Sequence, residues 1–186
     1  QMMEGEIRVE STPGVGSTFT LTLPVEAPLV QLRQLQDRRI EAAATSAQPK
    51  VVCIDGTSTA LFLMERRFHQ EGFFVVPVAD GGDAVEVIRQ VQPDLVTVDV
   101  HAPHLGGREL LAALRSDDEL EHLPVVLCSV DELISIPPMP KVATLTKPIR
   151  RKALKGVLRK LLPHLTSVEG LRTRIEPETG GREVHS

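Results

Sequence analysis

The most constraining feature of this sequence is an alternation of short apolar runs with amphipathic stretches between residues 50 and 162. The apolar runs are KVVCI (50–54), FFVVPV (73–78), LVTV (95–98), PVVLCS (124–129) and VATLT (142–146). The stretches 58–71, 83–92, 108–116 and 151–162 have the apolar spacing of amphipathic helices. Near-continuous apolar strands are typical of a sheet that is buried on both faces. The pattern therefore predicts an α/β fold with a doubly wound, five-stranded parallel sheet and helices on both faces.

One connection in this pattern is irregular. Residues 131–141, between the fourth and fifth strands, read DELISIPPMPK. Prolines at positions 137, 138 and 140 cannot continue a helix, because each lacks a backbone N–H and clashes with the preceding turn. We expect the fourth helix to be reduced to one or two turns at most.

The flanking segments have a different character. Residues 6–24 contain two runs of alternating apolar and polar residues around a Pro/Gly turn, which predicts a β-hairpin. A hairpin alone cannot bury a core, so we expect residues 1–24 to belong to a domain whose remainder is missing. Residues 25–49 read as a partly helical linker, and the polar residues 163–186 as a disordered tail.

Composition excludes several functions. The chain has 21 basic and 25 acidic residues, a formal net charge of −4, and only 3% aromatic residues with no Trp or Tyr. This balance argues against nucleic-acid binding by bulk charge or base stacking. No apolar stretch is long enough to cross a bilayer, so we expect no membrane contact. Cys53 and Cys128 lie inside apolar runs, which is typical of buried thiols in a cytoplasmic protein.

Polar side chains follow four of the predicted strands. Two carboxylates, a hydroxyl and an ammonium group stand at these strand ends, on Asp55, Asp99, Ser129 and Lys147. In a doubly wound sheet such residues meet at one edge. A carboxylate can accept a phosphoryl group, and cations and hydroxyl donors can neutralise the charge on the phosphoryl oxygens. We therefore expect phosphoryl transfer to Asp99, with Mg²⁺ held by carboxylates.

Residues 50–162 resemble the receiver domain of two-component response regulators. The resemblance rests on PDLVTVDVHAPHLGG (93–107), VVLCSV (125–130) and TLTKP (144–148). It implies a flavodoxin-like sheet with strand order 2-1-3-4-5, and a histidine kinase or histidine-phosphotransfer domain as partner. It also implies Asp99 as phosphoacceptor, Lys147 as phosphate clamp, Ser129 as switch hydroxyl, and a Mg²⁺ site formed by Asp55, Asp99 and the backbone carbonyl of His101.

The hairpin has a resemblance of its own. Its sequence STPGVGSTFTLTLP (11–24) is similar to the last glycine box and strands of a histidine-kinase ATP-binding domain. Together the two resemblances imply the C-terminal part of a hybrid histidine kinase, with a dimer possible through the parent kinase. The other kinase motifs are not in this sequence, so we expect it to catalyse only its own aspartyl phosphorylation and dephosphorylation.

Two departures from the receiver pattern leave an alternative open. Gly56 stands where the family usually has a second acidic residue, which contacts Mg²⁺. Thr144 stands where the family has its switch aromatic. A receiver that lacks these groups could instead be a pseudo-receiver, a protein-interaction module that is not phosphorylated.

Overall fold

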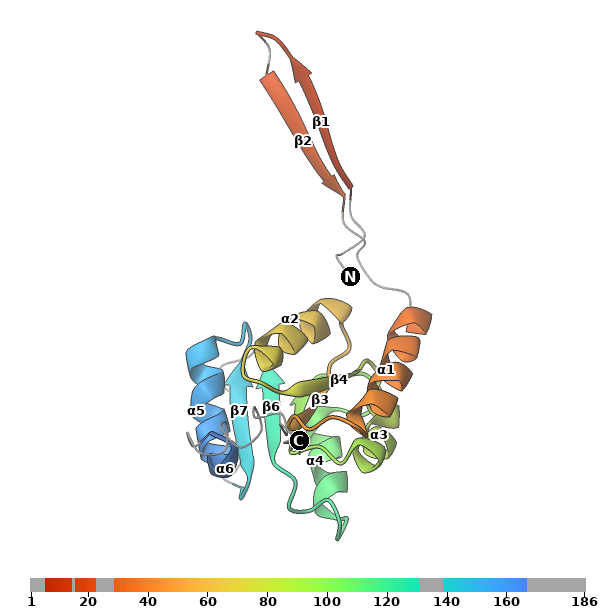
Figure 1. Ribbon diagram of the computed structural model, residues 1–186, viewed down its shortest axis with the longest axis vertical. Helices are drawn as coiled ribbons and strands as arrows, with labels where there is room; N and C mark the ends of the chain where they lie inside the picture. The colour runs from red at the N-terminus through yellow and green to blue at the C-terminus, as the bar shows by residue number, and fades with distance from the viewer. Residues whose placement is uncertain (1–5, 15, 23–28, 131–138, 167–186) are drawn as a thin grey trace, which may run out of the picture.

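A computed structural model describes residues 6–14, 16–22, 29–130 and 139–166 of this chain (Figure 1). The described residues form a two-stranded hairpin and a five-stranded sheet with helices around it. The helices around the five-stranded sheet are α1 (Leu29–Ala43), α2 (Ser58–His69), α3 (Ala84–Val91), α4 (Gly107–Arg115), α5 (Arg151–Leu161) and α6 (Pro163–Thr166). A 3₁₀ turn, η1 (Gly81–Asp83), precedes α3.

The central sheet is parallel throughout. Its strands are β3 (Lys50–Ile54), β4 (Phe74–Val78), β5 (Leu95–Asp99), β6 (Val125–Ser129) and β7 (Val142–Thr146). They lie in the order β4-β3-β5-β6-β7, which is 2-1-3-4-5 when the strands of this sheet are counted alone. The three inner strands are almost entirely buried, as their unbroken apolar sequences predict.

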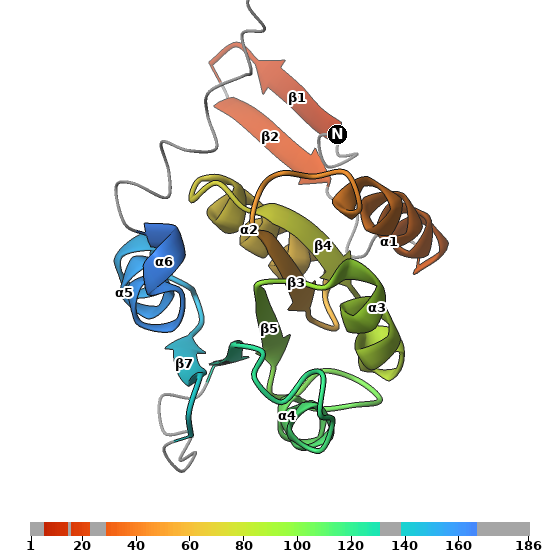
Figure 2. The same cartoon turned by 60° about the horizontal axis from the view of Figure 1, so that its bottom comes forward.

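Helices cover both faces of the sheet, and each face has its own core. On one face α1, α3 and α4 contribute Ala43, Ile88 and Leu110 to the core, together with their neighbours. On the other face α2 and α5 contribute residues such as Phe68 and Leu154. Figure 2 shows the two helix layers with the sheet between them. The prediction of a flavodoxin-like, doubly wound α/β fold is confirmed.

The helix α1 is part of this unit, although it precedes the first strand of the sheet. It lies beside α3 in both views (Figures 1 and 2) and packs on the edge strand β4. Ala43 at its end is only 1% exposed, and Ile40 packs against the same core. Arg39 forms an ion pair with Glu65 of α2, and its guanidinium lies 5.6 Å from the centre of the Phe74 ring.

The hairpin is formed by β1 (Glu6–Thr12) and β2 (Gly16–Thr22), which pair in antiparallel register, as predicted. Ile7 faces Leu21 and Val9 faces Phe19 across the ribbon. All four side chains are more than half exposed, between 56% and 72%. One face of the ribbon is therefore apolar, and no described part of the chain covers it.

The structure bears on three further expectations. The first residues of the predicted disordered tail form the short helix α6, because Leu162 and Leu165 pack against the α5 side of the core. The reduced fourth helix, expected within residues 131–141, falls mostly on positions 131–138, and most of the predicted tail falls on 167–186; both ranges lie outside the described residues. Among the described helices, none has the length and apolar content needed to span a bilayer.

Candidate active site

The four polar residues predicted at strand ends lie at the carboxyl edge of the sheet. Asp55 directly follows β3, Asp99 and Ser129 are the last residues of β5 and β6, and Lys147 directly follows β7. The inner strands β3, β5 and β6 are hydrogen-bonded neighbours in parallel register, so their ends meet. The fold thus brings these residues to one place from positions as far apart as 55 and 147.

Lys147 joins the two carboxylates. Its Nζ lies 2.5 Å from Oδ2 of Asp55 and 2.6 Å from Oδ2 of Asp99. The three side chains are 6%, 19% and 19% exposed for Asp55, Asp99 and Lys147, so the charges are largely withdrawn from water. Burial lowers the pKa of Lys147, but the hydrogen bonds and charges of Asp55 and Asp99 outweigh burial, and the pKa lies above its ordinary value. The peptide bond between Lys147 and Pro148 is cis.

Asp55 is held by the residue two positions along the chain. Its Oδ1 accepts hydrogen bonds of 3.0 Å from both the backbone N–H and the hydroxyl of Thr57. The same hydroxyl accepts a 3.4 Å hydrogen bond from the N–H of Ala60, as the N-cap of α2. Thr57 is a site residue that was not predicted from the sequence. A threonine directly before an apolar helix is typical of an N-cap, and this pattern could have predicted the position of Thr57.

Asp99 is fixed by the loop that follows it. Its Oδ1 accepts a 2.9 Å hydrogen bond from the backbone N–H of His101. The loop returns to the strand end at Gly107, whose N–H donates to the carbonyl of Val100. A side chain at Gly107 would press on the Asp99 carbonyl oxygen, 3.1 Å from its β-carbon, so glycine suits this close approach. Oδ2 of Asp99 is directed to Lys147, as described above.

Ser129 and Thr144 occupy neighbouring strands. Ser129 is buried, and its carbonyl oxygen accepts a 2.6 Å hydrogen bond from the backbone N–H of Lys147. The serine is thereby tied to the residue that bridges the carboxylates. Thr144 lies opposite Leu127 in the β6–β7 register and is exposed to solvent. Its short side chain cannot supply the apolar bulk of an aromatic ring.

The donor set suits a hard cation such as Mg²⁺, which prefers oxygen ligands. The oxygens of Asp55 and Asp99 converge closely enough to share the Lys147 ammonium, so they already form one cation position. The backbone carbonyl of His101 lies on the same loop as Asp99. A third carboxylate is missing, because position 56 is glycine and the Pro103 ring lies against it. The described residues contain no group of three or more His, Cys, Asp or Glu side chains that could hold a metal ion.

These groups can support transfer of a phosphoryl group to a carboxylate. The Asp99 carboxylate can act as a nucleophile, Lys147 places a positive charge beside it, and Ser129 stands at the adjacent strand end. His101 and Thr57 orient the carboxylates through hydrogen bonds that leave the Oδ2 atoms directed toward the cation position. The arrangement therefore has a nucleophile and a charge-neutralising group in contact.

Comparisons with known proteins agree with this architecture. Residues 51–159 match the response regulator receiver domain family. The chain is 33% identical over 132 residues to the autoinducer 2 sensor kinase/phosphatase LuxQ of Vibrio harveyi, covering 70% of this chain and 15% of that protein. It is 29% identical over 116 residues to the sensor protein EvgS of Escherichia coli O157:H7, covering 62% of this chain and 10% of that protein. The chain thus spans only a small part of these relatives.

Solved structures show the same fold. The receiver domain of a signal transduction histidine kinase from Syntrophus aciditrophicus superposes with a TM-score of 0.55 at 21% identity, covering 63% of this chain and 92% of that one. The receiver domain of a sensor histidine kinase from Pseudomonas aeruginosa PAO1 gives a TM-score of 0.57 at 20% identity, covering 63% of this chain and 99% of that one. The latter structure has a magnesium ion coordinated in its active site cleft.

Proposed function

This chain belongs to the response regulator receiver domain family, and from that premise we propose that Asp99 accepts a phosphoryl group from a phosphohistidine. The observation that carries the proposal is the bridge from Lys147 to both Asp55 and Asp99. It places a nucleophilic carboxylate in direct contact with a positive charge at the carboxyl edge of the sheet. The donor is a histidine kinase or a histidine-phosphotransfer domain, in a two-component phosphorelay.

The reaction exchanges one bond for another. An oxygen of Asp99 attacks phosphorus, the P–N bond of the phosphohistidine breaks, and the imidazole keeps the electron pair and takes a proton from water. Lys147 neutralises charge on a phosphoryl oxygen, and the Ser129 hydroxyl donates to another. Asp55, Asp99 and the carbonyl of His101 would hold Mg²⁺, which when bound neutralises a further oxygen. With one carboxylate fewer than is usual, this site binds Mg²⁺ weakly.

One experiment tests the phosphoacceptor role. The chain is incubated with Mg²⁺ and acetyl phosphate, and its intact mass is measured. We expect one added phosphoryl group on the wild type and on Asp118→Asn, which changes an exposed carboxylate outside the site. We expect none on Asp99→Ala. An adduct that survives Asp99→Ala would show that the acceptor lies elsewhere.

Gly56 favours a second candidate function for this domain. If the reduced donor set cannot hold Mg²⁺, the domain is a pseudo-receiver, which docks a partner through its surface without being phosphorylated. Lys147 then serves as a permanent counter-ion for Asp55 and Asp99. Absence of any adduct on the wild type, with no change in its NMR spectrum on adding Mg²⁺ and beryllofluoride, would favour this role.

We further propose that the parent protein is a cytoplasmic hybrid histidine kinase, in which β1 and β2 are the last strands of the ATP-binding domain. The exposed apolar face of the hairpin supports this, because it needs a partner layer to cover Phe19 and its neighbours. Sequencing the reading frame upstream of the codon for Gln1 tests the proposal. Glycine and asparagine boxes of a kinase are expected there, and their absence would overturn it.

A further inference from the structure

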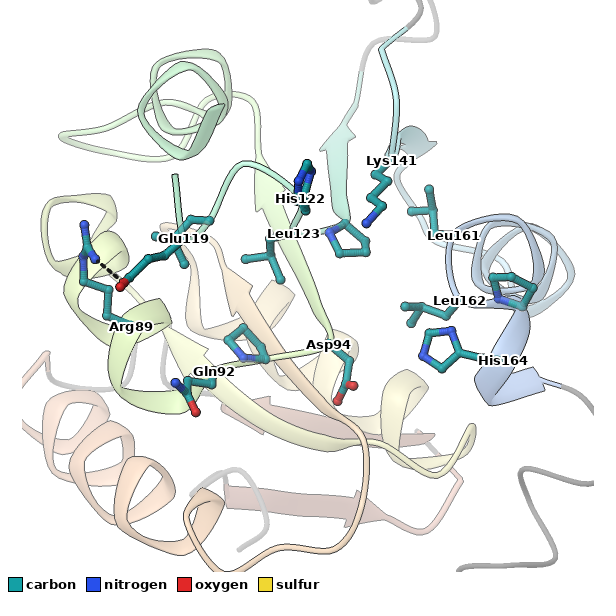
Figure 3. A pocket seen from close by; sticks show the side chains of 14 residues that line it. Arg89, Gln92, Asp94, Glu119, His122, Leu123, Lys141, Leu161, Leu162 and His164 are labelled. Atoms are coloured by element: carbon teal, nitrogen blue, oxygen red, sulfur yellow. Dashed lines mark hydrogen bonds and ion pairs between the residues drawn. The ribbon is translucent and has the colours of Figure 1, made fainter. Parts of the chain in front are cut away.

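A pocket lies at the end of the sheet opposite to Asp99. Its lining includes Asp94, Pro124 and Lys141, which directly precede β5, β6 and β7. The pocket lies beside these amino-terminal strand ends, between the end of α3 and the helices α5 and α6 (Figure 3). The cavity has a volume of about 880 Å³, and none of the active-site residues lines it.

The walls of the pocket combine apolar and charged groups. The apolar part is made by leucines and prolines from three separate segments: Leu120, Leu123, Pro93, Pro124, Leu161, Leu162 and Pro163. Lys141 points into this space in Figure 3 and has no ion pair within the ranges that the structure describes. Asp94 lies on the opposite side, where its Oδ2 accepts a 2.7 Å hydrogen bond from the backbone N–H of Lys50. A peptide with apolar side chains and charges of both signs suits these walls.

The chain itself supplies such a peptide at the rim. Helix α6 ends at Thr166, and its residues Pro163 and His164 form part of the pocket wall. The sequence continues from there as SVEGLRTRI (167–175), with Val168, Leu171 and Ile175 spaced by three and four residues. Charges of both signs stand between them, on Glu169, Arg172 and Arg174.

We propose that residues 167–175 dock in this pocket of the same chain, with the three apolar side chains against its leucines and Glu169 paired with Lys141. Nine residues can reach about 30 Å when extended, which is enough to cross a cavity of this volume. Because the segment is attached at the rim, its effective concentration at the pocket is of the order of millimolar. A separate partner of the same chemistry lacks this advantage.

A paramagnetic label on the full chain tests the docking. Thr173→Cys is labelled with a nitroxide, and the broadening of backbone amide signals is measured by NMR. The native thiols do not compete, because Cys53 and Cys128 are each 1% exposed and burial raises the pKa of both. We expect strong broadening at Leu123, Lys141 and Leu161. A label on Ser186→Cys, outside the segment, serves as the reference.

Apolar docking predicts that Leu171→Ser together with Ile175→Ser reduces the broadening from position 173 to the level of the reference. Equal broadening with and without these substitutions would overturn the proposal. Mixing ¹⁵N chains without label and unenriched labelled chains distinguishes a second copy. Broadening that persists undiminished in the mixture would show that the segment comes from another molecule, and would overturn docking within one chain.

Charge reversal tests the ion pair separately. Lys141→Glu should reduce the broadening at the pocket, because it places a carboxylate opposite Glu169. Adding Glu169→Lys to the same chain should restore it. The side chain of Lys141 is exposed and the other substitution lies at position 169, so neither change removes a buried side chain of the described core, and we expect both variants to fold. Failure of the double variant to recover would overturn the pairing of Glu169 with Lys141.

Discussion

Pro103 lies so close to Gly56 that a β-carbon on Gly56 would stand 2.6 Å from Cδ and 3.1 Å from Cγ of the proline. Contacts under about 3 Å require one of the groups to move, and a proline ring has little freedom to do so. The two residues come from the loops that follow β3 and β5, on either side of the carboxylate pair. Any side chain at position 56, an acidic one included, would therefore press on the loop that follows Asp99.

The first prediction concerns restoration of that carboxylate. Gly56→Asp should lower the free energy of unfolding by about 1–3 kcal/mol, because its β-carbon overlaps the Pro103 ring. Adding Pro103→Ala should recover part of this loss and raise Mg²⁺ affinity about tenfold over wild type, which corresponds to about 1.4 kcal/mol. Urea unfolding and a Mg²⁺ titration followed by NMR provide the two measurements.

Gly56→Ala is the control for that series, since it adds the β-carbon without a charge. It should be destabilised like Gly56→Asp and show no gain in Mg²⁺ affinity. If Gly56→Ala and Gly56→Asp were both as stable as the wild type, the close approach of Pro103 would not constrain this position.

The second prediction removes the bridging cation. Lys147→Met should destabilise the folded state by about 2 kcal/mol, because two neighbouring carboxylates that are largely withdrawn from water lose their shared counter-ion. Saturating Mg²⁺ should return part of this stability, since the metal binds only the folded site. Lys152→Met is the matched control on the exposed surface of α5 and should change stability by less than about 0.5 kcal/mol. Equal stability of the two variants would contradict the structural role of Lys147.

The third prediction follows from the raised pKa of Lys147. A group whose pKa is higher in the folded state stabilises that state below its ordinary pKa, and this contribution is lost as the pH rises through the raised value. The stability difference between wild type and Lys147→Met should therefore be constant near neutral pH and shrink in strongly alkaline solution. Urea unfolding at a series of pH values measures it, and the absence of tyrosine removes one competing titration. A difference that is unchanged at pH above the lysine range would refute the assignment.

Local sequence carried enough information to predict the sheet and the polar strand ends. Unbroken apolar runs such as KVVCI indicate strands buried on both faces, and a parallel sheet then places Asp55, Asp99 and Lys147 at one edge. A shared sheet edge does not by itself imply that the Lys147 ammonium contacts both carboxylates. That contact depends on side-chain geometry across 92 positions of sequence.

Other features depend on contacts that no local pattern encodes. The approach of Pro103 to Gly56 joins two loops, and neither loop's sequence specifies the distance between them. The place of α1 could not be predicted either. The spacing of its apolar residues indicates a helix but does not say where that helix packs. Helix α1 packs on β4, the edge strand of the sheet.

The last prediction tests whether α1 is a structural part of the receiver unit. Ala43 is 1% exposed in the core beneath α3, whereas its neighbour Ala42 is exposed. Ala43→Arg should lower the free energy of unfolding by about 2–3 kcal/mol, because a long charged side chain cannot fit there without displacing the helix. Ala42→Arg should change it by less than about 0.5 kcal/mol. Urea unfolding compares the two, and Arg39→Ala should show a smaller loss through its contacts with Glu65 and Phe74. Equal effects at positions 42 and 43 would mean that α1 separates from the sheet in solution and acts only as a connector.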